Sequence, residues 1–241
     1  MLGNPNYPTY QVFLAIGISA VITAALMPLF IRLMRHEGLG QQIRADGPQR
    51  HLVKQGTPTM GGLVMLAGVL VTCLLQVTWT AKLVLAVLAM LATGSLGLLD
   101  DIESVAHRRS LGLTPSQKMV GLILISVSFC LVATNACGIE PVISFPGGFT
   151  LDLGVLSSTF NIDGTVVQVP WLYVAFVFLL MAGLSNAVNL TDGLDGLSSG
   201  CSLVVMLAMA MVAFSYDEID LAVFAAAIAG ACLGFLWHNC Y

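Results

Sequence analysis

The strongest constraint on this chain is a series of long apolar runs separated by short polar segments. A membrane-spanning helix needs about 20 mostly apolar residues. Seven runs approach or reach that length: Tyr10–Leu33, Thr59–Val77, Leu83–Leu99, Met119–Ala136, Pro170–Leu190, Ser198–Tyr216 and Leu221–Trp237. Leu83–Leu99 and Leu221–Trp237 are short, and buried helices are the alternative for these two. We expect an all-α, polytopic transmembrane helix bundle of about seven spans, forming one integral-membrane domain over residues 1–241.

Composition excludes an ordinary soluble domain. Hydrophobic residues make up 57% of the chain and charged residues 9%, whereas about a quarter of a soluble domain is charged. The six cysteines form no C-x-x-C pair, and most lie inside apolar runs, so small buried hydrophobes are favoured over metal ligands or a disulfide framework. We expect membrane lipids as partners and no nucleic acid.

The basic residues predict the orientation of the spans. With seven spans, eight of the nine Lys and Arg residues lie on one side, in the segments after the first and third runs, and only Lys82 lies on the other. The positive-inside rule assigns the basic side to the cytoplasm, which places the N-terminus on the opposite side. The segment 137–169 then also lies outside. Its turn signal at 145–149 predicts a short β-hairpin, and 161–165 carries a second turn signal before a Val-rich run.

Acidic side chains gather in two places at the predicted cytoplasmic ends of apolar runs. The stretch Asn186–Leu197 contains Asp192 and Asp195, each followed by glycine, and Asp100-Asp101 follows the third run. Ionisable groups at membrane depth mark functional sites by default. Mg²⁺ is held by one or two carboxylates together with waters and substrate phosphates, so these acids beside basic loops indicate phosphoryl transfer.

Plainer readings apply to the same residues. Adjacent acids such as Asp100 and Asp101 are often only the solvated end of a helix, and from the sequence this is as favoured as a functional role. Arg108 and Arg109 serve topology or lipid head groups more often than catalysis. The histidines lack metal-ligand spacing.

Three separated segments resemble a known family. They are Gln42–Gly62, which contains Asp46-Gly47-Pro48 and Gly56-Thr57-Pro58-Thr59-Met60-Gly61-Gly62, then Gly97–Asp101, and then Asn186–Leu197. In this order they closely resemble the phospho-N-acetylmuramoyl-pentapeptide transferases, a branch of the polyprenyl-phosphate N-acetylhexosamine-1-phosphate transferases. The resemblance covers essentially the whole chain.

The resemblance implies a ten-helix enzyme of the bacterial inner membrane, with a periplasmic N-terminus and hairpin and a cytoplasmic active site. It implies transfer of phospho-N-acetylmuramoyl-pentapeptide from UDP-N-acetylmuramoyl-pentapeptide to undecaprenyl phosphate, which gives lipid I and UMP in peptidoglycan synthesis. Mg²⁺ is the implied cofactor, and a homodimer is a possible assembly.

The same resemblance implies roles for individual residues. Asp100 and Asp101 match the first acidic motif, where one is the base or orients the lipid phosphate; both are possible metal ligands. Asp192 and Asp195, with Asn189, match the motif for the uridine side of the nucleotide. Lys54 and Thr59 match a loop that borders the site, and Asn239 matches an asparagine near the nucleotide.

In the family the chain continues past position 241, with a metal-binding aspartate, further helices and a His-rich loop. We therefore expect this chain to be incomplete at its C-terminus and inactive alone. Two alternatives stay open: a transferase that uses UDP-N-acetylglucosamine, and an inactive fragment or non-catalytic membrane bundle. A transporter-like bundle would need acids deep inside the helices, and the seven runs are almost free of charge.

Overall fold

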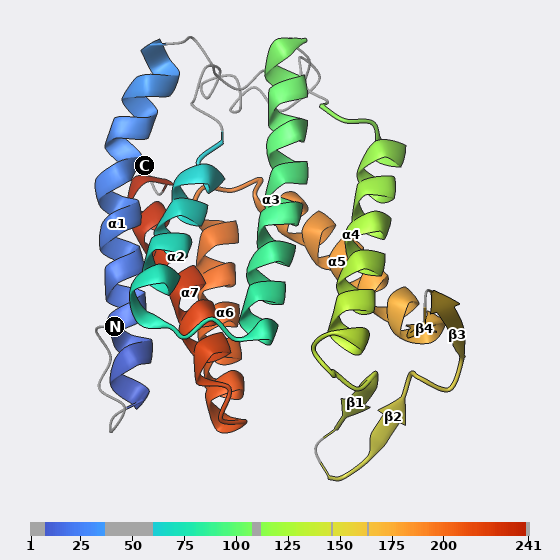
Figure 1. The fold of residues 1–241 in the computed structure, drawn as a ribbon. Helices are drawn as coiled ribbons and strands as arrows, with labels where there is room; N and C mark the ends of the chain where they lie inside the picture. The colour runs from blue at the N-terminus through green and yellow to red at the C-terminus, as the bar shows by residue number, and fades with distance from the viewer. Residues whose placement is uncertain (1–7, 37–59, 108–111, 146, 163, 240–241) are drawn as a thin grey trace. The chain divides into compact units, whose positions relative to one another are not determined.

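The computed structural model describes residues 8–36, 60–107, 112–145, 147–162 and 164–239, and the helices within these ranges confirm a polytopic helical protein (Figure 1). The helices are α1 (Pro8–His36), α2 (Gly62–Gln76), α3 (Ala81–Ala106), α4 (Pro115–Asn135), α5 (Trp171–Thr191), α6 (Leu197–Ser215) and α7 (Ile219–Asn239). Each corresponds to one predicted apolar run. Among the described residues, six helices are long and apolar enough to cross a membrane, and α2 is shorter, at 15 residues.

The third and seventh helices are longer than the apolar runs that predicted them. Helix α3 has 26 residues and α7 has 21. Apolarity ends at Leu99, but the backbone hydrogen bonding of a helix does not require apolar side chains, so α3 continues through Asp100 and Asp101 to Ala106. The alternative of a buried helix suits α7 in part, because ten of its 21 residues are buried inside the protein. Helix α7 is also long and apolar enough to span a membrane.

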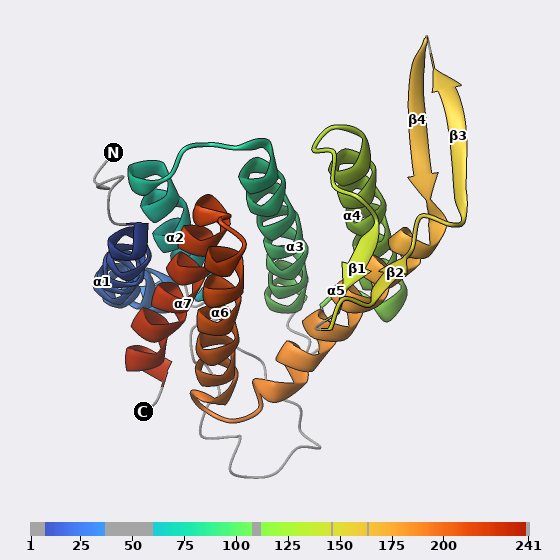
Figure 2. The same cartoon turned by 90° about the horizontal axis from the view of Figure 1, so that it is seen from below.

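The chain divides into two compact units, and the first comprises Met1–Trp79, Gly94–Thr114 and Val188–Tyr241. Its centre is α7, which packs against α1, α2 and α6 (Figure 2). Small residues of α7 permit this close approach. A Cβ at Gly230 or Gly234 would collide with backbone carbonyl oxygens of α1, at Ile16 and Ala20 respectively. Close packing of small residues is a main source of helix association in a bilayer, where lipid tails remove the hydrophobic driving force.

Polar side chains also lie between α1 and α2. In the orientation that satisfies both of its polar atoms, the buried amide of Gln76 donates to the Gln11 carbonyl over 3.0 Å and accepts from the Ala15 N–H over 3.2 Å. The hydroxyls of Ser19 and Thr23 are buried in α1 without a hydrogen-bond partner among the described residues. A Cβ at Gly68 of α2 would collide with the Thr23 hydroxyl, so a glycine is needed where these two helices meet.

The second unit comprises Thr80–Thr93 and Pro115–Ala187 and contains two antiparallel hairpins. Strands β1 (Val142–Ser144) and β2 (Thr150–Asp152) form the predicted hairpin, with Ile143 opposite Leu151. The second turn signal also becomes a hairpin, formed by β3 (Ser157–Ile162) and β4 (Thr165–Pro170). Gly164 in its turn has a φ of 84°, a conformation that glycine adopts without strain.

One side chain ties the second hairpin to the end of α4. The Asn135 amide donates to the Gln168 carbonyl over 2.9 Å and accepts from the Gln168 N–H over 2.8 Å. A side-chain amide thereby pairs with a strand backbone as a neighbouring strand would. The indole N–H of Trp171, at the start of α5, donates to the Ser158 hydroxyl over 2.9 Å.

Candidate active site

The candidate residues that the structure describes all belong to the first unit. Asp100 and Asp101 lie in the second half of α3, Asn189 lies in the last turn of α5, and Asn239 is the last residue of α7. Asp192 and Asp195 lie between α5 and α6. The C-terminal ends of α3, α5 and α7 and the start of α6 lie toward the same end of the helices (Figure 1). Lys54 and Thr59 are outside the described residues.

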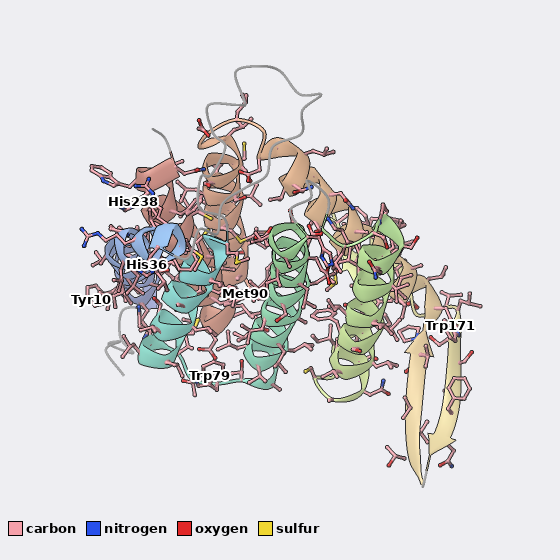
Figure 3. The ribbon with its side chains drawn as sticks, turned by 90° about the horizontal axis from the view of Figure 1, so that it is seen from above. Tyr10, His36, Trp79, Met90, Trp171 and His238 are labelled. Atoms are coloured by element: carbon pink, nitrogen blue, oxygen red, sulfur yellow. The ribbon has the colours of Figure 1, made fainter. Side chains whose placement is uncertain are left out.

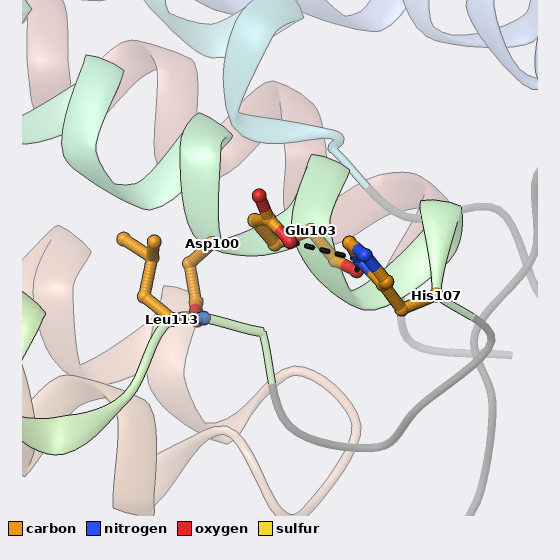
Figure 4. Close-up of polar contacts among 4 residues, drawn as sticks. All are labelled: Asp100, Glu103, His107 and Leu113. Atoms are coloured by element: carbon orange, nitrogen blue, oxygen red, sulfur yellow. Dashed lines mark hydrogen bonds and ion pairs between the residues drawn. The ribbon is translucent and has the colours of Figure 1, made fainter.

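Asp100 holds the segment that follows α3. Its side chain is half-buried, and one carboxylate oxygen accepts the backbone N–H of Leu113 over 2.7 Å (Figure 4). Gly112 lies so close that a Cβ there would collide with the Asp100 carbonyl oxygen. A hydrogen bond to an ionised acceptor is stronger than a neutral one, so Asp100 fixes Gly112 and Leu113 against α3.

The two acids of the first motif are inside a helix, and the reading of a solvated helix end is wrong for them. Helix α3 continues past them for more than a turn, and both are half-buried. Neighbouring positions on a helix do not face each other, so Asp100 and Asp101 point in different directions and suit different tasks.

The last turn of α3 carries an exposed ion pair. His107 Nδ1 lies 2.8 Å from a Glu103 carboxylate oxygen, and the two side chains are 57% and 47% exposed (Figure 4). Exposed pairs of this kind contribute little, typically about 0.3–0.5 kcal/mol when four residues apart on a helix. We give this pair a local structural role.

The second acidic motif forms a sharp turn. The Asp192 N–H still bonds to the Val188 carbonyl over 3.1 Å, after which α5 ends. Gly196 adopts a left-handed conformation with a φ of 74° immediately before α6. The motif is therefore a glycine turn between α5 and α6 and not a continuous helix. Asp192 and Asp195 are exposed on it.

The chemistry of the described carboxylates fits Mg²⁺, but they do not form a cluster. Carboxylate oxygens are the hard ligands that Mg²⁺ prefers, and it needs only one or two of them with waters and substrate phosphates. Among the described residues, no group of three or more His, Cys, Asp or Glu side chains gathers as a metal site. The four aspartates therefore do not form one cluster, and a bound Mg²⁺ would rely on Asp101 or Asp100 and on the substrate.

Sequence reasoning missed the contacts of Gly112 and Leu113 with Asp100. The signal was a glycine between two leucines in an otherwise polar loop. Such a glycine indicates close approach of the backbone to another group, but it does not identify which group. The partner is 13 residues away in sequence, and only the fold reveals it.

Comparison with known proteins places the chain in a family. The model of "Glycosyl transferase family 4" matches residues 83–241, and "Phospho-N-acetylmuramoyl-pentapeptide-transferase signature 1" matches residues 54–66, which include Lys54 and Thr59. A phospho-N-acetylmuramoyl-pentapeptide-transferase of Halalkalibacterium halodurans is 37% identical over 230 residues, covering 94% of this chain and 66% of that protein. The same-named protein of Geobacillus kaustophilus is 38% identical over 239 residues, covering 97% and 68%.

A third relative of the same name, from Thermobifida fusca, is 36% identical over 247 residues, covering 93% of this chain and 68% of that protein. The chain spans about two thirds of the length of these curated relatives. The matches run through the signature loop and both acidic motifs. The chain therefore belongs to glycosyl transferase family 4 and, within it, to the phospho-N-acetylmuramoyl-pentapeptide-transferases.

Proposed function

We propose that this chain supplies most of a membrane transferase that moves phospho-N-acetylmuramoyl-pentapeptide from UDP-N-acetylmuramoyl-pentapeptide to undecaprenyl phosphate, giving lipid I and UMP. The observation that supports the proposal is the sequence similarity to transferases of that name, at 37% and 38% identity over more than nine tenths of the chain. The multi-pass apolar helices suit a lipid acceptor, because it can arrive laterally while a soluble nucleotide arrives from water.

The reaction needs a nucleophile and a neutralised leaving group. An oxygen of the lipid phosphate attacks the phosphorus on the sugar side of the pyrophosphate, and the bond from that phosphorus to the bridging oxygen breaks, so the oxygen leaves with UMP. Positioning and charge stabilisation dominate such transfers. When bound, Mg²⁺ would neutralise the charge of the pyrophosphate.

The two acids of α3 receive separate roles in this proposal. Asp100 accepts the Leu113 N–H and so holds the border of the site in place. We assign its carboxylate the additional role of contacting the reacting phosphates or a bound Mg²⁺. Asp101 is on a neighbouring helical position that points elsewhere, and it takes the proton of the lipid phosphate or orients that phosphate. Both carboxylates thus act on the acceptor side of the reaction.

The nucleotide side is assigned to the turn between α5 and α6. Asp192 and Asp195 are exposed there, Asn189 is exposed one turn earlier, and Asn239 is half-buried at the end of α7. Carboxylate and amide groups can form hydrogen bonds with the uracil ring and with the ribose hydroxyls. Lys54 and Thr59, within the matched signature, would border the phosphates.

Orientation and assembly belong to the same proposal. The basic segments after α1 and α3 put the acidic motifs on the cytoplasmic side of the inner membrane and the N-terminus in the periplasm. A homodimer is the proposed assembly, and its test is chemical cross-linking of the detergent-purified protein at a series of concentrations.

The deciding experiment is exchange of radiolabelled UMP into UDP-N-acetylmuramoyl-pentapeptide, with Mg²⁺ and undecaprenyl phosphate in detergent. The 241-residue chain is assayed beside a version joined to the remaining C-terminal third of the Geobacillus kaustophilus relative. We expect exchange in the joined protein alone, because about a third of the relative's length lies outside the match. Folded but silent joined protein would overturn the proposal, as would exchange only when UDP-N-acetylglucosamine replaces the donor.

A further inference from the structure

The hairpin of β3 and β4 has one apolar face and one polar face. Directly paired residues of antiparallel strands share a face. Phe160 pairs with Val167, and Val169 lies two residues along β4 on the same face. Val169 pairs with Ser158 on this face. The other face carries Thr159 opposite Gln168 and Asn161 opposite Val166. We call the more apolar face, with Phe160, Val167 and Val169, the ribbon face.

In the described part of the second unit, the outer part of the hairpin is open. Phe160 is 50% exposed, and Val155 and Leu156 just before β3 are 78% and 56% exposed. An isolated two-stranded hairpin is marginally stable in water unless a face packs against something. Val167 and Val169 are partly covered by the protein, so the open part of the ribbon face is at Phe160.

The hairpin is fixed at the end of two membrane helices. Asn135 bonds to both backbone groups of Gln168 at the end of α4, and β4 passes directly into α5 at Trp171. The ribbon is foreshortened in Figure 1, where α4 runs in the plane of the page, and extended in Figure 2, which looks along α4. The ribbon therefore lies across the direction of α4, as an element on a membrane surface would.

Trp171 supports a position at the membrane boundary. It lies where β4 meets α5 (Figure 3), its side chain is 48% exposed, and its indole N–H is satisfied by Ser158. Tryptophan is enriched at membrane–water interfaces, where an apolar ring and a polar N–H both find partners.

We propose that the ribbon face rests on the bilayer and is buried among lipid head groups and the first acyl carbons, on the side opposite the basic loops. Residues 157–170 contain one charged residue, Asp163, so apolar contact and not charge attraction would hold the ribbon there. Anchors at the interface set the tilt and depth of the helices that they join. The ribbon would act in this way on α4 and α5, and this role is independent of the transferase reaction.

The test compares fluorophores on the two faces in vesicles. Cys137, Cys201 and Cys240 are replaced by serine, and the buried Cys73, Cys130 and Cys232 are kept. An environment-sensitive maleimide dye is placed by Phe160→Cys or by its neighbour Thr159→Cys on the opposite face. Each protein is reconstituted into phosphatidylethanolamine–phosphatidylglycerol vesicles with or without lipids spin-labelled near the head group.

We expect a blue-shifted emission for the Phe160→Cys dye and severalfold stronger quenching by spin-labelled lipid than for the Thr159→Cys dye, which aqueous iodide should quench. Val167→Cys and Gln168→Cys form a second matched pair on β4, in case one variant fails to fold. The difference should persist when phosphatidylglycerol is replaced by phosphatidylcholine, because the ribbon lacks basic residues.

Equal quenching of both faces would overturn the proposal. So would protection of the ribbon face only after bacterial membrane proteins are added, because a protein would then be the partner.

Discussion

At the scale of single residues, Asp100 combines a structural contact with a proposed chemical role, and two substitutions separate them. Asparagine at this position keeps an oxygen for the Leu113 N–H but loses the charge, whereas leucine loses both. We expect Asp100→Asn and Asp101→Asn each to lower UMP exchange in the joined protein by roughly 10²-fold or more, the range for loss of an acid–base group. Substantial exchange in Asp100→Asn but not in Asp100→Leu would show that Asp100 acts only by holding the loop.

Gly112 offers a test of the loop contact that needs no activity. A side chain at this position collides with the Asp100 carbonyl, so Gly112→Val should displace Leu113 from the Asp100 carboxylate. We expect faster tryptic cleavage at Arg108 and Arg109 and a loss of about 1–3 kcal/mol, typical of overpacking. Gly97→Ala in α3 is the matched control, because a Cβ there meets nothing within 4 Å. Unchanged cleavage in Gly112→Val would contradict the contact.

At the scale of secondary-structure elements, α7 is the helix on which the first unit depends. Gly230 and Gly234 lie against the backbone of α1, so Gly230→Leu should push the two helices apart. We expect a clear fall in the unfolding temperature, measured by size-exclusion chromatography of heated, detergent-solubilised protein. Gly183→Leu in α5 is the control, since a Cβ there meets open space. If both variants unfold at the same temperature as the parent protein, α7 does not pack against α1 in the way described.

The link between α4 and the β3–β4 hairpin rests on Asn135. Replacing it with leucine removes two hydrogen bonds to Gln168, each contributing about 0.5–1.5 kcal/mol. Amide hydrogen exchange of β3 and β4 should therefore accelerate in Asn135→Leu. Ser215→Ala at the end of α6, which loses only a bond to its own helix, should leave that exchange unchanged. Slow exchange in both variants would show that the hairpin does not need this link.

The elements could be predicted from the sequence much better than their contacts. Apolar length identified the seven helices of the described residues, and turn residues predicted the first hairpin and marked the turn of the second, because these signals are local. The end of α3 was missed because polar residues such as Asp100 continue a helix as readily as apolar ones. The contacts of Asp100 with Leu113 and of Asn135 with Gln168 join residues 13 and 33 positions apart. No local pattern encodes such pairings, and the roles of Asp192, Asp195, Asn189 and Asn239 stay predictions.

At the scale of the whole molecule, the topology depends on whether α2 spans the membrane. Its 15 residues extend about 22 Å at about 1.5 Å per residue, which is less than the ~30 Å hydrocarbon core. Two observations favour a span: α2 packs against both α1 and α7, and Thr72, Cys73 and Gln76 are buried in that packing. A short span can be accommodated by local thinning of the bilayer.

If α2 spans, the start of α1 at Tyr10 lies on the same side of the membrane as the hairpins and opposite Glu103. We expect a membrane-impermeant maleimide to label Tyr10→Cys and Val155→Cys in right-side-out vesicles, and Glu103→Cys only after the vesicles are opened. Tyr10, Val155 and Glu103 are all exposed, so accessibility within the protein is matched. Cys137, Cys201 and Cys240 are replaced by serine as above. Labelling of Val155→Cys but not Tyr10→Cys in sealed vesicles would mean that α2 does not cross. The N-terminus would then lie on the cytoplasmic side, and the proposed orientation of α1 would be reversed.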